Sequence, residues 1–565
     1  MTDIRRTLLW VVFTMSLVLL WDAWNAHTGK PTLFGGGTRP SAQAPAATTP
    51  ATPAPTADAV PQAITGADAA PGGQNAVPAA GTPAAAPGAE QVTLTTDVVR
   101  ATFDSRGGTL VGLDLLAFDD AQAPGRPVRL MLQDGARMYM AQSGLIATRP
   151  GASLPNHLTP MRVRPAPREL AADAKEVSVS FESTGIDGVT VVKTYTLTRG
   201  RYDIAVTHAL SHGGSEPVEP QLYLQLARDG NPPPGESSFY FTFTGPAVYT
   251  EAAKFQKIDF KDIAEGDAKY ERSAQDGWIA MVQHYFTSAW LLPAAQPREF
   301  RTAKVGDGLY TVAMVTPLGV LEPGATRTHT ATLYAGPQNE YVLAELAPGL
   351  DLVKDYGWFT ILSKPLFWLL TQLHAMIGNW GWAIVALVVL LKIAFYWLNA
   401  SAYRSMAKMK AVGPRLTELR ERYKDKPQQM QQEMMRIYRE EKVNPLGGCL
   451  PILVQMPFFI ALYWVLLSSV EMRNAPWILW ITDLSAKDPW FILPILMTAS
   501  SLFQVWLNPR PPDPMQARLM WFMPLAFGVM FFFFPAGLVL YWLTNNILSI
   551  AQQWWINKRL GVIGK

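Results

Sequence analysis

Five long apolar stretches near the C-terminal end constrain the fold of this chain more strongly than any other feature. A helix needs about 20 mostly apolar residues to cross the hydrocarbon core of a bilayer. Trp gathers at membrane interfaces, and 14 of the 19 Trp lie at or after Trp358. The sequence therefore predicts a helical membrane core at 346–565. Its predicted spans, all without Asp or Glu, are 380–398, 446–470, 490–507, 519–534 and 536–556.

A short apolar segment at the N-terminus adds a sixth predicted transmembrane helix. Arg5 and Arg6 precede the apolar run Thr7–Trp21. Cleavage of a secretory signal peptide requires small residues in an A-x-A pattern, whereas Trp24-Asn25-Ala26 has Trp at the first of these positions. We therefore interpret residues 1–28 as an uncleaved signal anchor whose N-terminus is cytoplasmic. A cleaved signal peptide remains the alternative.

Two regions of different composition follow the anchor. Residues 29–91 are rich in Pro and Ala and nearly free of charged and aromatic side chains, which predicts a disordered linker because such a stretch buries too little apolar surface to fold. From 92 to 345 the apolar period changes to two, as in Val177, Val179 and Phe181, and turns such as Arg106-Gly107-Gly108 separate the runs. This pattern predicts a large antiparallel β-sandwich, placed in the periplasm by the orientation of the anchor.

The segments on either side of the span at 380–398 are more polar. Residues 358–377 include Lys364, Gln372 and His374, so we expect an amphipathic helix lying along the membrane interface. Residues 399–445 are rich in Lys and Arg, which places them and the C-terminus in the cytoplasm. Apolar residues recur there every seven positions, which predicts a helical hairpin with a methionine-rich seam. The seam methionines are Met406, Met409, Met430 and Met434.

The basic face of this hairpin has two compatible interpretations. One is the solvated surface of a self-packed hairpin. The other is a surface that meets anionic lipid or ribosomal RNA.

A single cation lies deep in the first core span. Lys392 follows Val389-Leu390-Leu391 and is about two turns, or roughly 10 Å, from the predicted cytoplasmic end. It either extends to the interface by snorkelling or faces a hydrated cavity. The amides and hydroxyl of Gln455, Asn545 and Ser549 are candidates to line the same cavity, although a lone polar residue in a span also serves as contact between helices.

Several classes of membrane protein are disfavoured by what the sequence lacks. The five C-terminal spans contain no carboxylate for proton coupling, and the chain has no HExxH pair and no GxxxxGK[ST] loop. One Cys among 565 residues excludes a cysteine-cluster metal site. His208 and His212 are interpreted as two surface histidines rather than metal ligands. We therefore expect no enzyme activity, no metal and no cofactor.

Several motifs in the core resemble those of the YidC/Oxa family of membrane protein insertases, in its Gram-negative form. The resemblance covers Trp358 to the end, and the anchor, linker and outer sandwich match the family layout less specifically. Two positions depart from the family pattern: Lys392 stands where Arg is usual, and Tyr396-Trp397 replaces a common Tyr-Pro. The motifs are Ser405-Met406-Ala407-Lys408-Met409, Asn444-Pro445-Leu446-Gly447-Gly448-Cys449, Gln455-Met456-Pro457, Asp513-Pro514-Met515-Gln516 and Phe534-Pro535-Ala536-Gly537-Leu538-Val539-Leu540-Tyr541-Trp542.

The resemblance implies a bacterial inner-membrane protein that inserts and helps to fold newly made membrane proteins, alone or with the Sec translocon. It implies a groove open to the cytoplasm and to lipid, with Lys392 in the basic position and Gln455, Asn545 and Ser549 around it. By position, the residues implied to line a hydrophobic slide for the client helix are Met456, Phe459, Met530 and Trp542. The implied partners are nascent membrane proteins, the Sec translocon, membrane lipids and, weakly, the ribosome.

Two other functional classes remain open from the residues alone. A secondary transporter or channel with a periplasmic sensing domain predicts an internal repeat and discontinuous helices, and no repeat is evident among the spans. A membrane assembly scaffold that moves nothing across the bilayer also fits the pattern.

Overall fold

The computed structural model describes residues 90–120, 122–135, 137–149, 152–183, 185–234, 242–306, 308–423, 426–441, 450–508 and 514–559. The predicted signal anchor at 1–28 and all but the last two residues of the predicted linker at 29–91 lie outside these ranges. Strands dominate the chain up to Pro337, and helices dominate it from Glu340 onward.

The strands of the described residues form two nine-stranded sheets with antiparallel pairing between neighbours. One sheet has the order β1-β2-β3-β4-β5-β10-β17-β16-β13, and the other has the order β12-β11-β14-β15-β18-β9-β8-β7-β6. The strands are β1 (Gln91–Thr95), β2 (Val99–Asp104), β3 (Thr109–Asp120), β4 (Ala123–Gln133), β5 (Met138–Ala147), β6 (Met161–Val163), β7 (Glu176–Ser183), β8 (Val189–Thr198), β9 (Asp203–His212), β10 (Pro220–Asp229), β11 (Gly245–Thr250), β12 (Lys254–Lys257), β13 (Ser273–Ala274), β14 (Trp278–Val282), β15 (Phe286–Leu291), β16 (Arg298–Gly306), β17 (Leu309–Pro317) and β18 (Thr326–Pro337).

The predicted β-sandwich is therefore confirmed, and its strands follow the expected period of two. Along β8, buried and half-buried side chains alternate at every position. The predicted turn at Arg106-Gly107-Gly108 joins β2 to β3, and both glycines have positive φ, a conformation that costs Gly little. A Cβ on Gly107 would lie 2.3 Å from the Cα of His157, so this turn packs directly against a neighbouring loop.

The interpretation of His208 and His212 as surface histidines was wrong. Their side chains are buried, with 0% and 3% exposure. His208 Nε2 lies 2.9 Å from the hydroxyl of Ser143, and His212 Nε2 lies 2.6 Å from the backbone oxygen of Glu216. Both face inward on β9, where the sequence pattern shows a polar residue but neither the partner of His208 on β5 nor that of His212 in the loop after β9.

The helices begin with two short ones in and after the sandwich. These are α2 (Phe260–Glu265) and α3 (Glu340–Leu346). The remaining elements are η1 (Leu350–Val353), η2 (Gly357–Phe359), α4 (Thr360–Ile377), α5 (Trp380–Ala394), α6 (Tyr396–Arg422), α7 (Pro427–Glu440), α8 (Leu450–Ser468), η3 (Val470–Met472), α9 (Ile492–Leu507), α10 (Pro514–Phe531) and α11 (Ala536–Arg559).

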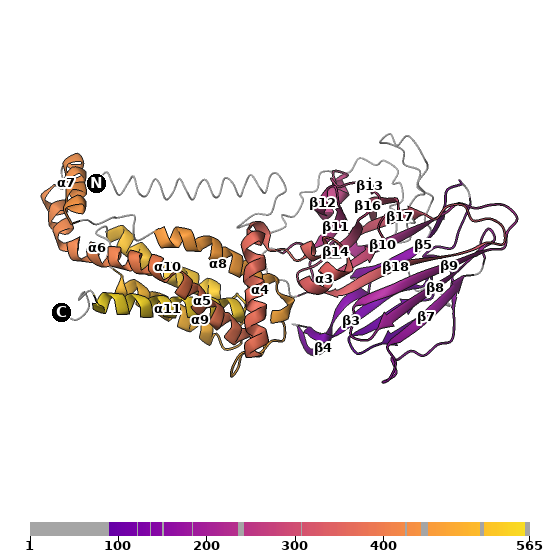
Figure 1. Ribbon diagram of the computed structural model, residues 1–565, viewed down its shortest axis with the longest axis horizontal. Coiled ribbons are helices and arrows are strands. Elements are labelled where there is room, and N and C mark those ends of the chain that lie inside the picture. The colour runs from indigo at the N-terminus through magenta and orange to yellow at the C-terminus, as the bar shows by residue number, and fades with distance from the viewer. Residues whose placement is uncertain are drawn as a thin grey trace, which may run out of the picture.

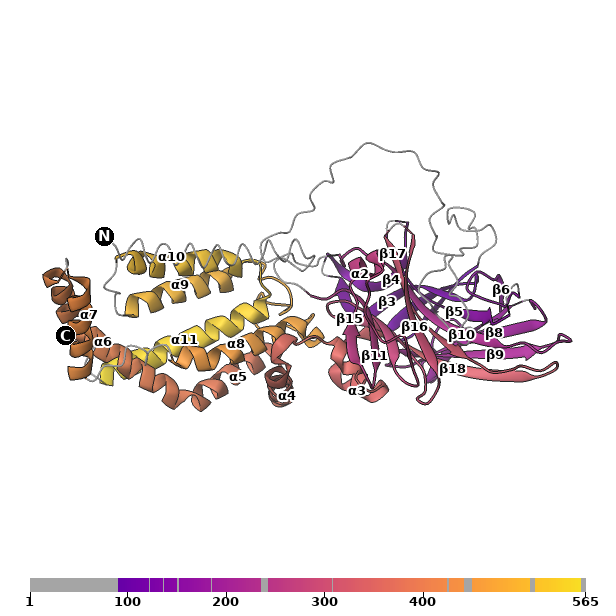
Figure 2. The same ribbon diagram turned by 90° about the horizontal axis from the view of Figure 1, so that it is seen from above.

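The helical part is elongated, with the sandwich at one end and α7 at the other (Figures 1 and 2). Helix α4 runs across the direction of the other helices, next to the sandwich (Figure 1). It packs against α5 and α8, and it buries Leu366, Phe367 and Leu370 in the apolar cluster of the helical core. The predicted helix at 358–377 corresponds to α4, and its place along a membrane interface stays a prediction.

Within the described ranges no single helix is both long enough and apolar enough to cross a membrane. Helices Trp380–Ala394 and Tyr396–Met406 together reach the needed length and hydropathy, but the pair is bent by 67°.

The bend shows where the structure departs from the predicted span at 380–398. Helix α5 ends at Ala394, and α6 begins at Tyr396 and continues into the predicted hairpin. Between them, the ring of Phe395 packs edge to face on Phe458 of α8, with centroids 5.0 Å apart. The sequence has no Pro or Gly at this position, so a contact with another helix marks the break.

Candidate functional site

Three helices meet at the hydroxyl of Ser549. The ammonium of Lys392, in the last turn of α5, donates a hydrogen bond to Ser549 Oγ at 2.7 Å. Ser549 donates in turn to the backbone oxygen of Asn545 at 2.7 Å, and the phenol of Tyr403 on α6 also bonds to Ser549. The structure thus brings together two of the residues that the sequence analysis grouped, and it adds Tyr403.

Helix α11 presents a polar face to the interior of the helical core. Asn546, Ser549, Gln553 and Asn557 are all buried, and their spacing of three or four residues puts them on one side of a helix. Asn546 Nδ2 donates to Ser500 Oγ on α9 at 2.8 Å. The sequence analysis missed Gln553 and Asn557, which helical periodicity from Ser549 identifies.

Gln455 and Asn545, the other two predicted groove residues, are both half-buried, on α8 and α11. Their grouping with Lys392 remains a prediction.

The four residues predicted to line a hydrophobic slide have different surroundings. Met456 is 45% exposed on α8. Phe459, Met530 and Trp542 are half-buried and pack against the apolar cluster of the core. Trp542, for example, lies between the rings of Phe531 and Phe534, at 5.0 and 5.5 Å. These contacts show that three of the four pack partly against the core, and their role in a slide remains a prediction.

Helices α9 and α10 carry another apolar surface. A pocket of about 490 Å³ opens between these helices, and both helices carry exposed apolar residues. None of the four predicted slide residues lines this pocket, although Met530 lies on α10. The pocket residues are Ser501, Val505, Leu519, Met520, Met523, Pro524, Phe527 and Phe531.

The predicted hairpin at 399–445 contains the helices α6 and α7, and its seam is partly as expected. Met409 and Met434 pack with Val412 and Leu416 between the two helices. Met406 and Met430 are half-buried but lie outside this cluster. The side chain of Arg415 pairs with Glu441 across the hairpin.

The described parts of the chain were predicted to hold no metal site. Among those residues no three His, Cys, Asp or Glu side chains gather in a way that would hold a metal ion.

Comparison with known proteins identifies the family. Residues 91–369 match the family described as the YidC periplasmic domain, and residues 372–562 match the 60Kd inner membrane protein family. The membrane protein insertase YidC of Cupriavidus necator is 54% identical over 562 residues, with 99% of this chain and 98% of that protein covered. The chain belongs to the YidC family of membrane protein insertases.

A second relative agrees with this assignment. The membrane protein insertase YidC of Bordetella petrii is 51% identical over 573 residues, covering 99% of this chain and 98% of its own. The solved structure titled "Active YidC insertase crystal structure with the first transmembrane domain resolved" has a TM-score of 0.38 and 18% identity, covering 82% of this chain and 91% of that chain. The insertase family resides in the bacterial inner membrane and acts on newly made membrane proteins.

Proposed function

We propose that this insertase moves the polar end of a client protein through a groove between α5 and α11, and that Lys392 is the central residue of that groove. One observation supports this most directly: the Lys392 ammonium donates to Ser549, where the buried polar face of α11 meets α5. The five predicted C-terminal spans contain no Asp or Glu to neutralise this cation. The cation therefore attracts an acidic or polar client tail without holding it as a fixed salt bridge.

The physical basis is the cost of polar groups in hydrocarbon. An unpaired polar group of a peptide costs several kcal/mol in the bilayer interior, and hydrogen-bonding groups such as Ser549, Asn545 and Gln455 lower that cost. Burial of the apolar segment of the client, at about 25 cal/mol per Å², provides the driving force without ATP. The exposed Met456 and the pocket between α9 and α10 are the apolar surfaces proposed to guide that segment.

We further propose a topology with six transmembrane helices. The spans are 1–28, 380–398, 446–470, 490–507, 519–534 and 536–556, with both termini in the cytoplasm. Two features support this orientation: the basic α6–α7 hairpin and the sandwich lie at opposite ends of the helices (Figure 1), and α4 runs across them. The sandwich is then periplasmic, and the hairpin is placed to contact anionic lipid or the ribosome.

The test is rescue of an insertase-depleted strain with Lys392→Ala, Lys392→Glu and Lys392→Arg. We expect Arg to retain insertion of a client with an acidic tail, Ala to weaken it and Glu to abolish it. Lys304→Glu makes the same change on an exposed strand of the sandwich and is expected to have no effect. Unchanged insertion in Lys392→Glu would refute the proposal, and a scaffold that translocates nothing predicts that result.

A further inference from the structure

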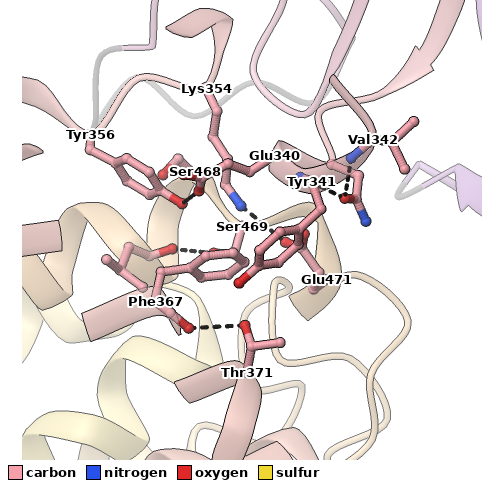
Figure 3. A network of polar contacts seen from close by, with 12 residues as sticks. Glu340, Tyr341, Val342, Lys354, Tyr356, Phe367, Thr371, Ser468, Ser469 and Glu471 are labelled. Atoms are coloured by element: carbon pink, nitrogen blue, oxygen red, sulfur yellow. Dashed lines mark hydrogen bonds and ion pairs between the residues drawn. The ribbon is translucent and has the colours of Figure 1, made fainter. Parts of the chain in front are cut away.

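A buried lysine joins the sandwich to the helical core. Lys354 lies between η1 and η2, in the segment that leads from the sandwich to α4, and its side chain has 0% exposure. Its ammonium is 3.3 Å from Glu471 Oε2 in η3. Helix η3 follows the C-terminal end of α8, which we call the outer end. The same ammonium lies 3.7 Å from the centroid of the Phe367 ring on α4. Figure 3 shows these groups converging.

A second layer of charge surrounds this pair. The phenol of Tyr356 donates to Glu340 Oε2 on α3 at 2.8 Å. Lys364 on α4 lies 2.7 Å from Asp351 Oδ2 and 3.6 Å from Glu340 Oε1. Glu340 therefore connects the last helix of the sandwich to both the linking segment and α4.

The electrostatics indicate that Lys354 depends on these partners. Burial lowers the pKa of Lys354, and the carboxylates of Glu471 and Glu340 oppose that shift. Removal of one partner from a buried ion pair leaves an uncompensated charge and is strongly disruptive, whereas exposed pairs contribute little.

The outer turn that carries Glu471 also contacts the sandwich directly. Arg473 donates to the backbone oxygen of Asp119 at 2.7 Å, and the side-chain oxygen of Asn474 accepts from the amide of Asp119 at 3.3 Å. Just before this turn, at the end of α8, the backbone oxygen of Leu467 bonds to the ring of His284 in the sandwich. The turn at 469–474 is thus held from two sides, by the sandwich and by Lys354.

We propose that Lys354 is a positioning residue for insertion, which fixes the outer end of α8 against α4 and against the sandwich. Helix α8 contacts α11, one of the two helices of the proposed groove, and carries Gln455 and Met456, so its placement affects that groove. The inference rests on the insertase activity of the family and on the proposed groove. Its test has a readout that substitution of Lys392 is not expected to change.

The experiment uses the full-length protein in proteoliposomes, with Cys449 replaced by Ser. Lys354→Met keeps the length of the side chain without its charge, and Glu471→Gln removes the ion pair but leaves the cation on Phe367. We expect each to reduce insertion by roughly tenfold, as for the loss of a buried pair. Arg149→Met disrupts an exposed pair with Glu216 and is the matched control, expected to be unaffected.

A cross-link separates positioning from local folding. Asp119→Cys with Asn474→Cys is introduced into each variant, and a short bifunctional thiosulfonate joins the two thiols. We expect slower cross-linking in Lys354→Met and Glu471→Gln, and recovery of insertion once the link has formed. Lys392→Glu is expected to lose insertion while cross-linking at the rate of the parent protein.

Two results would overturn the proposal. One is insertion within twofold of the parent protein in both Lys354→Met and Glu471→Gln. The other is insertion that stays low after the cross-link has formed in a folded variant. Should Lys354→Met fail to fold, Glu471→Gln gives the decision by the same criteria.

Discussion

Three histidines, two of them buried and one half-buried, should make the sandwich and its junction with the core sensitive to acid. Burial, together with the nearby charges of Lys193 and Arg106, lowers the pKa of His157 to about 3. Burial also lowers the pKa of His208, with contributions from Lys193 and His329.

At the junction with α8, burial lowers the pKa of His284 to about 4, aided by Arg473 and opposed by the hydrogen bond to Leu467.

The expected loss of stability follows from the difference in proton uptake. Each histidine titrates near pH 6.5 in the unfolded chain but at a lower pH in the folded protein, so the unfolded chain binds more protons below pH 6.5. Stability is then full above pH 6.5 and falls by about 1.4 kcal/mol per pH unit for each histidine. Between pH 7.5 and pH 5 the loss is about 2 kcal/mol per histidine, or about 6 kcal/mol for the three.

The assay is hydrogen exchange of the intact protein in detergent at pH 7.5 and pH 5, with labelling times scaled to the intrinsic exchange rate. We expect β5, β8, β9 and the β14–β15 turn to lose protection at pH 5, while α9 and α10, which contain no histidine, stay unchanged. His157→Gln should reduce the pH dependence by about one third of the total. The reasoning fails if protection of these strands is equal at both pH values, or if His157→Gln loses as much as the parent protein.

Two further substitutions test the outer surface of the helical core. Gly381→Ala places a Cβ about 2.2 Å from Trp477 Cδ1 and should destabilise the protein by about 1–3 kcal/mol. The measurement is the urea midpoint, and an unchanged midpoint would show that the outer loop adapts. Asp488 is 1% exposed and accepts hydrogen bonds from Trp480 Nε1 and the amides of Trp490 and Leu493. Asp488→Ala should cost about 2–4 kcal/mol and increase hydrogen exchange at the start of α9. Equal exchange there in variant and parent would contradict this.

The sequence predicted the sandwich and most helix positions because their apolar periods are regular. The pattern along β8 is an example, yet Lys193 occupies one of its inward positions and is fully buried. Its ammonium donates to the backbone oxygens of Gly107 and Ser143. Such partners lie far away in the sequence, so the period gives the direction of a side chain but not its partner. The surface interpretation of His208 failed for the same reason.

The candidate site was predicted in part. A cation in an acid-free span identified Lys392, and the polar residues of the last span identified Ser549, which the structure joins at 2.7 Å. The break at Phe395 and the ion pair of Lys354 with Glu471 depend on contacts between distant segments, which no local pattern encodes. The slide residues came from motif positions, and packing with Phe531 and Phe534 covers part of Trp542.

The central claim is that Lys392 faces water that is continuous with the cytoplasm. The direct measurement is the reaction of Lys392→Cys, in a Cys449→Ser background, with a membrane-impermeant thiol reagent added from either side of oriented vesicles. Ile393→Cys is the matched control. Ile393 is next to Lys392 in the chain, its side chain is 65% exposed, and it should face lipid. We predict labelling at 392 from the cytoplasmic side only, slowed by a bound client, and no labelling at 393. Absence of labelling at 392 from the cytoplasmic side, or labelling from the periplasmic side, would contradict the account.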